Sequence, residues 1–448
     1  MLKKILSYGF VEGLAKGLNK SIFLLLPFFL NTTEFGKISL LVSVELLIPL
    51  LTLLGLEKAV LRFYSEKSKY QFFNKTVSIA TIFSNLILLF ILFILYINDM
   101  KYIFSLKIFP DLFLIIILVY FQGYNRIKFN ILRVEERHKT YYRGRLFFQV
   151  SKFVLILVIV YLSGSYLGYL YGGIVAALST SILLKFSFET SQKEKFYKST
   201  FLSLFSFSWP FMLHGLSVKM LANADKFIIE EFLTLNEVGT YTFAYSIGSM
   251  MLFAYIGVSV YMEPLIYKAK NKKSLEALLS KYLALTLSSG LIAFLIIIIA
   301  STYVVPILYD ESYNVVLDFI PLIAIAYMIY PYYLKSNYRM IYYNKSLNVA
   351  LISILSAMLN ITLNILLMPE YGIFAAVFAT AISFFFQSIL FTLLSNKFQI
   401  SKEFFEVLIL GSVVLLIIYF EISFYLSVIP MVIILFINNI KKINPWSH

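Results

Sequence analysis

The chain has 448 residues, of which 60% are hydrophobic and only 14% are charged. Soluble domains carry about 25% charged residues, so this composition excludes a soluble fold and favours a chain that crosses a bilayer many times. The lack of cysteine excludes disulfides and cysteine-ligated metal sites. Because the three histidines are scattered, we expect no metal centre and no other cofactor.

Apolar runs separated by polar breaks predict about fourteen transmembrane helices, each built from roughly 20 apolar residues. The helices before the tail are expected at Leu6–Leu30, Gly36–Leu56, Thr76–Ile97, Leu112–Tyr124, Leu146–Leu162, Leu167–Phe186, Phe201–Ile229, Val238–Met262, Tyr282–Val305, Phe319–Leu334, Leu347–Met368 and Tyr371–Leu394. The tail Phe404–Ile437 is too long for one span and is interrupted by Glu421, so it predicts a terminal hairpin. About twelve spans is the alternative if the last two do not cross.

The distribution of the basic residues between inner and outer segments agrees with this number of spans. With an even number of spans and both ends inside, most of the 38 Lys and Arg residues fall in inner segments, the largest group between Arg126 and Arg145. Outer loops hold only Lys37, Lys101 and Lys107. Topology and contact with membrane lipid therefore explain most of the net charge of +14, and nucleic acid is not an expected partner. We expect a multi-pass protein of a bacterial plasma membrane with both termini in the cytoplasm.

Two stretches of the chain repeat at nearly the same spacing. Leu30, Glu34, Gly36 and Ser39 recur as Leu233, Glu237, Gly239 and Thr242, at an offset of 203 residues. A second match, at an offset of 200, relates Tyr171–Ile182 to Tyr371–Ile382. An even number of spans separates the copies, so both halves have the same orientation. The pattern predicts two parallel six-helix lobes around a central cavity, 1–200 and 201–395, followed by a terminal hairpin and tail, 396–448.

Several lysines fall inside predicted spans, where a charge costs roughly 2.5–3.5 kcal/mol at the bilayer centre and faces a cavity or a partner. Lys16 and Lys20 are four residues apart on one helical face, and Lys219 with Lys226 lies on the repeat-equivalent helix. Lys152 is close enough to its helix end to snorkel. The residues expected to bind an anionic group in the cavity are Lys16, Asn19, Lys20, Lys219 and Asn223. The alternative is that each lysine pairs with an acid, such as Lys20 with Glu45.

Three further polar groups inside spans are candidates for binding a coupling proton or sodium ion: Glu45, His214 and Asp225. A histidine has an unperturbed pKa near 6.5 and suits proton transfer, although His214 could equally be a hydrogen-bonded bystander. Tyrosines are abundant, and the group between Tyr330 and Tyr343 is interpreted as an aromatic belt at a membrane interface.

Three stretches resemble the polysaccharide biosynthesis family of Wzx-type O-antigen or capsule repeat-unit flippases. They are LNTTEFGKISLLVSVELLIPLLTLLGLEKAVLRF (Leu30–Phe63), ADKFIIEEFLTLNEVGTYTFAYSIG (Ala224–Gly248) and NITLNILLMPEYGIFAAVFATAI (Asn360–Ile382). The family belongs to the multidrug/oligosaccharidyl-lipid/polysaccharide exporter superfamily. The resemblance implies alternating access and a cargo of undecaprenyl-type isoprenoid pyrophosphate carrying an oligosaccharide. It also adds Arg62, in the signature Gly55–Arg62, to the substrate-binding candidates without defining its role.

The expected function is therefore transport without enzymatic activity: movement of a lipid-linked oligosaccharide, of O-antigen (lipopolysaccharide) or capsule type, from the inner to the outer leaflet. A cation-coupled multidrug exporter of the same superfamily is the first alternative, although its cavity should be acidic. A membrane glycan polymerase or ligase is the alternative of another class, but such enzymes need larger outer loops than this chain offers. Coupling to protons or sodium and contact with glycan polymerase machinery are left open.

Overall fold

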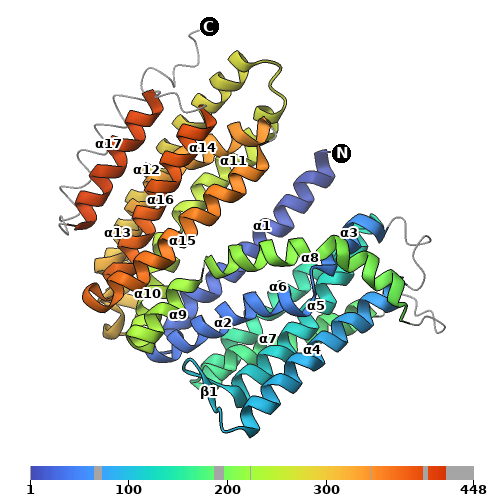
Figure 1. Ribbon diagram of the computed structural model, residues 1–448. Coiled ribbons are helices and arrows are strands. Elements are labelled where there is room, and N and C mark those ends of the chain that lie inside the picture. The colour runs from blue at the N-terminus through green and yellow to red at the C-terminus, as the bar shows by residue number, and fades with distance from the viewer. Residues whose placement is uncertain are drawn as a thin grey trace. The chain divides into compact units, whose positions relative to one another are not determined.

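The computed structural model describes residues 2–64, 73–185, 196–221, 223–343, 345–396 and 402–419. Nearly all of them are helical (Figure 1), and among them lies one short hairpin of strands β1 (Tyr102–Ile103) and β2 (Leu106–Lys107). Ten of the described helical segments are long and apolar enough to cross a membrane. The predicted all-α, polytopic membrane fold is confirmed. The second half of the predicted terminal hairpin lies outside the described residues.

The chain divides into two compact units, Met1–Gly239 and Thr240–His448. The helices of the first unit are α1 (Leu2–Leu25), α2 (Thr32–Thr52), α3 (Leu56–Phe63), α4 (Phe73–Ile97), α5 (Phe113–Val134), α6 (His138–Ser163), α7 (Leu167–Lys185), α8 (Lys198–Leu221) and α9 (Ala224–Phe232), with the short helices η1 (Leu26–Phe28) and η3 (Ile108–Leu112). Helix α5 packs against α2, α4 and α7 (Figure 1). The lobe boundary at residue 200 stays a prediction.

The second unit begins within α10 (Leu235–Gly248). Its further elements are α11 (Met251–Tyr267), α12 (Lys272–Leu308), η4 (Glu311–Tyr313), α13 (Val316–Ala326), η5 (Tyr327–Ile329), α14 (Tyr330–Tyr342), α15 (Ser346–Tyr371), α16 (Ile373–Ser395) and α17 (Lys402–Tyr419). Helix α16 packs against α13, α14, α15 and α17. The first helix of the predicted terminal hairpin is thus part of the packing of this unit.

The outer face of α4 shows why these units need a bilayer. Phe83 and Phe90 are 64% and 62% exposed, and Leu86 between them is 55% exposed. A contiguous apolar surface of this kind is rare on soluble monomers and stable when it faces lipid. The opposite face of α4 carries its buried residues, including Val77 and Ala80.

Two predicted spans are broken where the sequence analysis expected continuous helices. The span Gly36–Leu56 ends as α2 at Thr52, because Leu54 and Gly55 adopt positive φ angles of 53° and 70° before α3 begins. The span Phe201–Ile229 is divided into α8 and α9 around Asn223. The Asn223 side chain competes with the helix for backbone hydrogen bonds by donating to the Lys219 carbonyl at 2.9 Å, which favours a break at this residue.

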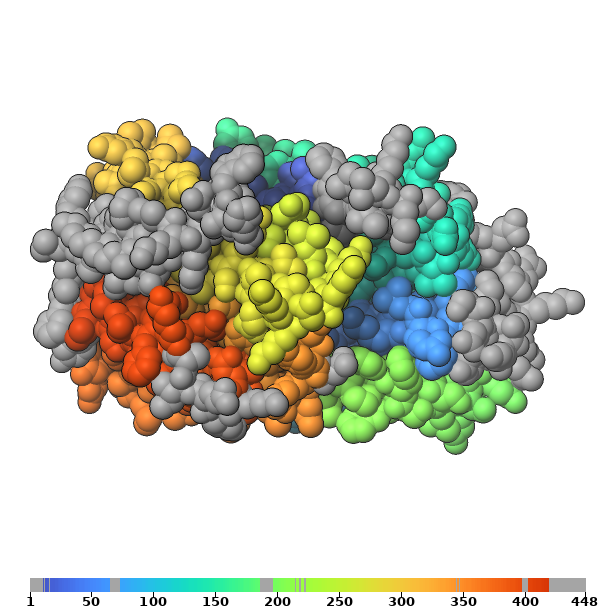
Figure 2. All heavy atoms as spheres, turned by 90° about the horizontal axis from the view of Figure 1, so that it is seen from above, coloured from blue at the N-terminus to red at the C-terminus, as the bar shows by residue number. Residues whose placement is uncertain are grey.

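Helix α8 packs closely on the first of these breaks. A methyl group at Gly55 would overlap the backbone carbonyl of Ser208, whose hydroxyl donates to the Leu54 carbonyl at 3.0 Å. Glycine is therefore required at position 55 both for its left-handed backbone and for the close approach of α8. Figure 2 shows α8 (light green) lying alongside the blue segment that contains α3.

The repeat at offset 203 appears in the first unit as a reciprocal contact. Gly36 in the first turns of α2 lies against Gly239 in the first turns of α10. A methyl group at Gly36 would overlap the Leu235 carbonyl, and one at Gly239 would overlap the Thr32 carbonyl. Thr32 and Leu235 are themselves 203 residues apart, so the two helix starts cross backbone to backbone through equivalent residues. The second predicted match differs in structure, because Gly172 lies inside α7 whereas Gly372 (φ 55°) lies at the bend before α16.

Candidate functional site

Two lysines meet inside the first unit at the break between α8 and α9. Lys20 extends from α1 and Lys226 from the first turn of α9, and their ammonium groups are close enough to repel each other. Lys226 Nζ lies 3.4 Å from Asn223 Oδ1. Asn223 is 6% exposed and donates from Nδ2 to the Lys219 carbonyl at 2.9 Å, which fixes its side chain at the end of α8.

Asp225 partly balances these two positive charges. Its carboxylate is 8% exposed, accepts a hydrogen bond from the Lys226 backbone N–H at 2.9 Å and attracts the Lys226 ammonium. Two ammonium groups against one carboxylate leave a net positive charge beside the N-terminus of α9, which itself favours anions. The arrangement can therefore hold an anionic group, and we call Lys20, Asn223, Asp225 and Lys226 the cationic cluster.

Several predicted site residues take other positions. Asn19 lies next to Lys20 on α1 and is partly buried. Lys16 and His214 lie on the described helices α1 and α8, but their side chains fall outside the described part of the chain. Lys219 of α8 is partly buried, and Arg126 is close enough to repel its ammonium group. Arg62 lies in the last turn of α3, where it is exposed and its guanidinium is 5.2 Å from the ring centroid of Phe63.

Glu45 forms a separate buried network. Its carboxylate pairs with Lys152 Nζ at 3.1 Å and accepts hydrogen bonds from Tyr169 at 2.6 Å and Gln122 at 2.7 Å. The interpretation of Lys152 as a snorkelling residue is wrong, since this side chain is buried and ion-paired. Likewise, the described partner of Glu45 is Lys152 rather than Lys20. Three partners satisfy the carboxylate, which makes a buried charge tolerable at this position.

Sequence reasoning missed a second ionic network, in the second unit. Lys335 and Arg339, expected in an inner loop, lie on α14 and are 1% and 3% exposed. Arg339 forms salt bridges with Glu276 of α12 and with Glu403 of α17, the latter at 3.3 Å. Lys335 also pairs with Glu403. These acids are more than 60 residues distant in sequence, so no local pattern reveals the pairing.

The tyrosines expected in an interfacial belt are divided between interior and surface. Tyr332 and Tyr338 are 3% and 7% exposed, whereas Tyr343 is 44% exposed. Deeper in the unit the Tyr245 and Tyr327 hydroxyls are 2.7 Å apart. Tyrosine buries a large ring with one hydroxyl, which gives this interior polarity without charge.

The fold is that of known membrane transporters. The chain is similar to the lipid II flippase MurJ in its inward closed conformation, with a TM-score of 0.67 and 16% identity over 98% of this chain and 98% of that chain. It is also similar to a multidrug resistance MATE family transporter of the MOP superfamily in its inward-facing conformation, with a TM-score of 0.61 and 15% identity over 88% of this chain and 96% of that one. At these identities the likeness shows the fold alone. No curated protein sequence matches.

A family model extends the comparison to sequence. The model of the family described as "Polysaccharide biosynthesis protein" matches residues 1–262, which is more than half of the chain. This range includes α1, α9 and the cationic cluster. The chain therefore belongs to the polysaccharide biosynthesis protein family.

Proposed function

We propose that this protein is a flippase that moves isoprenoid-pyrophosphate-linked oligosaccharides from the inner to the outer leaflet of a bacterial plasma membrane. The observation that carries the proposal is the cationic cluster, in which Lys20 and Lys226 meet at the break between α8 and α9 in a member of this family. Broken helices whose ends face a charged group are a recurrent way to bind ions at membrane depth. The family match and the likeness to MurJ support the same class of cargo.

The chemistry of the cluster suits a pyrophosphate. Two ammonium groups that repel each other are stabilised when a dianion enters between them, because each then gains an opposite charge in a medium of low dielectric constant. Lys16 and Lys219, on the same helices, remain predicted members of this site, and Arg62 remains a predicted substrate contact without a defined step. Alternating access would then carry the bound headgroup across the membrane while the isoprenoid chain stays in lipid.

O-antigen and capsule repeat units are the proposed cargoes, with membrane lipid as the surroundings. Glu45 and Asp225 are the described candidates for a coupling ion, and His214 is a further proposed candidate. Of the two, Asp225 lies within the cationic cluster and could couple cargo binding to protonation directly. Contact with glycan polymerase machinery belongs to the same proposal.

Reconstitution tests the function directly. Purified protein in vesicles receives a defined isoprenoid pyrophosphate oligosaccharide, and transfer between leaflets is scored with and without proton or sodium gradients. We expect Lys20→Ala and Lys226→Ala each to reduce transfer by about tenfold, which corresponds to roughly 1.4 kcal/mol of lost binding. Lys20→Arg should retain most transfer because it keeps the charge. Lys101→Ala, which removes a lysine that is 66% exposed in an outer loop, is the matched control.

Two results would overturn the proposal. If the protein inserts normally but the double variant of Lys20 and Lys226 transfers at the rate of the control, the cluster does not bind cargo. If the vesicles instead export organic cations in exchange for protons or sodium, the protein is the multidrug exporter. New glycosidic bonds in the product would identify a polymerase or ligase.

A further inference from the structure

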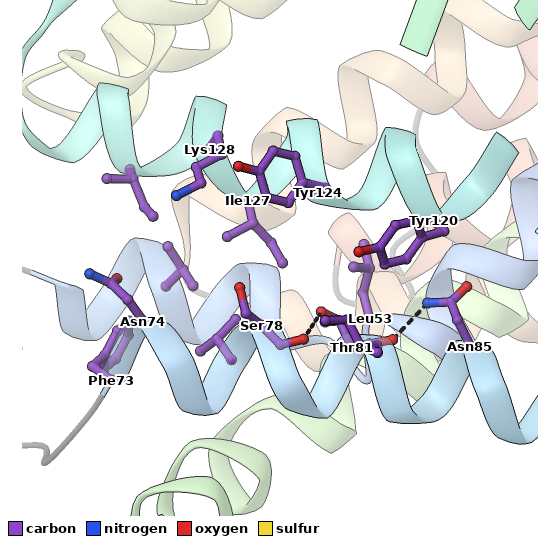
Figure 3. Close-up of a pocket in the computed structure, with 14 residues that line it drawn as sticks. Leu53, Phe73, Asn74, Ser78, Thr81, Asn85, Tyr120, Tyr124, Ile127 and Lys128 are labelled. Carbon is purple, nitrogen blue, oxygen red and sulfur yellow. Dashed lines mark hydrogen bonds between the residues drawn. The ribbon is translucent and has the colours of Figure 1, made fainter. Parts of the chain in front are cut away.

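A polar groove lies between α4 and α5, apart from the cationic cluster. It encloses a free volume of about 100 Å³. Leu53, which directly follows α2, and Val60 of α3 also line it. A cavity needs roughly 10–15 Å³ of such volume for each water molecule, so several waters or a small polar group fit inside. Figure 3 shows the side chains of α4 and α5 facing each other across it.

The α4 wall of the groove is a single polar stripe. The polar residues that line it are Asn74, Ser78, Thr81 and Asn85. Their spacing of three to four residues places them on one face of the helix. Bilayer-spanning helices rarely carry four polar side chains on one face unless that face meets a polar partner.

The hydrogen bonds of this stripe leave acceptors open. Thr81 Oγ1 donates to the Ser78 carbonyl at 2.9 Å, and Asn85 Nδ2 donates to the Thr81 carbonyl at 2.7 Å (Figure 3). The donors of these two bonds are thus used within α4 itself. Asn85 is 4% exposed, and its Oδ1 has no hydrogen-bond partner among the described residues; the same holds for Asn74 Oδ1. An unsatisfied buried acceptor is destabilising, so these two oxygens favour an occupant that donates hydrogen bonds.

The α5 wall supplies a different kind of surface. Tyr120, Tyr124 and Lys128 follow one another at intervals of four residues and line the groove opposite the stripe. The Lys128 ammonium lies 5.5 Å from the ring centroid of Tyr124, at the end of the groove near Asn74 (Figure 3). Among the described residues that line the groove none carries a carboxylate, so it does not favour cations.

We propose that this groove binds sugar residues of the oligosaccharide headgroup. Sugar hydroxyls donate the hydrogen bonds that the two amide oxygens lack, and the apolar faces of pyranose rings pack on the tyrosine rings. Lys128 adds a preference for acidic sugars over basic ones. The inference rests on the proposed function, since it assigns the sugar part of the same cargo to a site distinct from the pyrophosphate-binding cluster.

The natural absence of cysteine provides a direct binding test. A Ser78→Cys variant places one thiol in the groove, where a water-soluble thiol reagent should react. We expect an isoprenoid pyrophosphate tetrasaccharide, at roughly ten times its Kd, to slow the reaction about tenfold. The same carrier without sugar should not slow it. Ser163→Cys, at the exposed end of α6, is the control whose reaction neither carrier changes.

A second measurement separates sugar binding from structural support. Tyr124→Ala and Asn85→Leu should each reduce transfer of the tetrasaccharide carrier about tenfold, or 1.4 kcal/mol, and leave transfer of a single-sugar carrier nearly unchanged. Tyr124→Phe keeps the ring and should retain transfer of both carriers. Tyr161→Ala, which removes a tyrosine that is 68% exposed on α6, is the matched control.

The outcomes of these tests are distinct. Equal loss for both carriers, or equal protection of Ser78→Cys by the sugar-free carrier, overturns the groove proposal. Transfer by the wild type without any sugar-dependent protection also overturns it while the flippase function stands. Sugar-dependent protection without transfer supports the groove and overturns the flippase function.

Discussion

The two units stabilise their polar interiors by different means. In the first unit a buried ion pair between Glu45 and Lys152 is completed by Tyr169, and the mutually repelling Lys20 and Lys226 lie in the same unit. In the second unit tyrosine hydroxyls form interior hydrogen bonds, with the Tyr245 and Tyr327 hydroxyls 2.7 Å apart and Tyr255 donating to the Tyr327 carbonyl at 3.0 Å. The ionic network of that unit lies on α12, α14 and α17.

The internal repeat shows this difference between the two units at one pair of equivalent positions. At the offset of 203, Glu45 corresponds to Gly248, where a methyl group would come within 2.7 Å of the Ile323 side chain. The second unit therefore packs helices closely where the first unit holds a charge. The repeat has kept its helix starts and changed this interior position.

The largest effect should come from separating the ion pair of the first unit. Glu45→Leu leaves Lys152 buried without its partner and should lower the free energy of unfolding by about 3–5 kcal/mol. Adding Lys152→Leu should recover most of this loss, because neither charge is then buried. Denaturant unfolding in detergent micelles measures both values. A double variant as unstable as the single one would show that the pair contributes packing rather than charge compensation.

An intermediate effect is expected where the repeat is conserved. Gly36→Ala and Gly239→Ala should each lower the free energy of unfolding by about 1–3 kcal/mol, and by similar amounts, since each methyl group meets a backbone carbonyl that cannot move easily. Gly257→Ala on α11, which has open space around it, should leave stability unchanged or raise it. Markedly unequal losses at Gly36 and Gly239 would contradict the reciprocal contact.

The smallest effect is expected when a single tyrosine hydroxyl group is removed from either unit. Tyr169→Phe removes a hydrogen bond to a charged acceptor and should cost about 1.5–3 kcal/mol, whereas Tyr255→Phe removes one to a neutral carbonyl and should cost about 1 kcal/mol. The same unfolding assay gives both numbers. Equal costs would show that the interiors of the two units do not differ in charge as described.

The spans could be predicted from sequence because each is a local signal. A run of about 20 apolar residues needs no knowledge of the rest of the chain, and every predicted span before the tail falls on helices in the structure. The breaks within spans were missed, since a hydropathy pattern does not register the positive φ of Leu54 or the cap at Asn223. Leu53 and Leu56 beside the first break are apolar and hide it from such a pattern.

The polar contacts could be predicted only in part. Lys20 and Lys226 were identified by their depth in apolar segments, and the structure brings them together within the first unit. Lys152, Lys335 and Arg339 were placed near helix ends or in loops because nothing close in sequence marks their acids. The groove between α4 and α5 arises from two helices whose relative rotation no single-chain pattern specifies. Long-range pairing, rather than residue type, limited the prediction.

The crossing of Gly36 and Gly239 also gives the repeat a local symmetry. Residue 36 meets residue 239 and the carbonyl of residue 235, and residue 239 meets residue 36 and the carbonyl of residue 32. Such reciprocity is the mark of an isologous contact, in which one surface patch meets its own copy about a two-fold axis. Two helix starts 203 residues apart therefore form, within one polypeptide, the kind of contact that homodimers form between two chains.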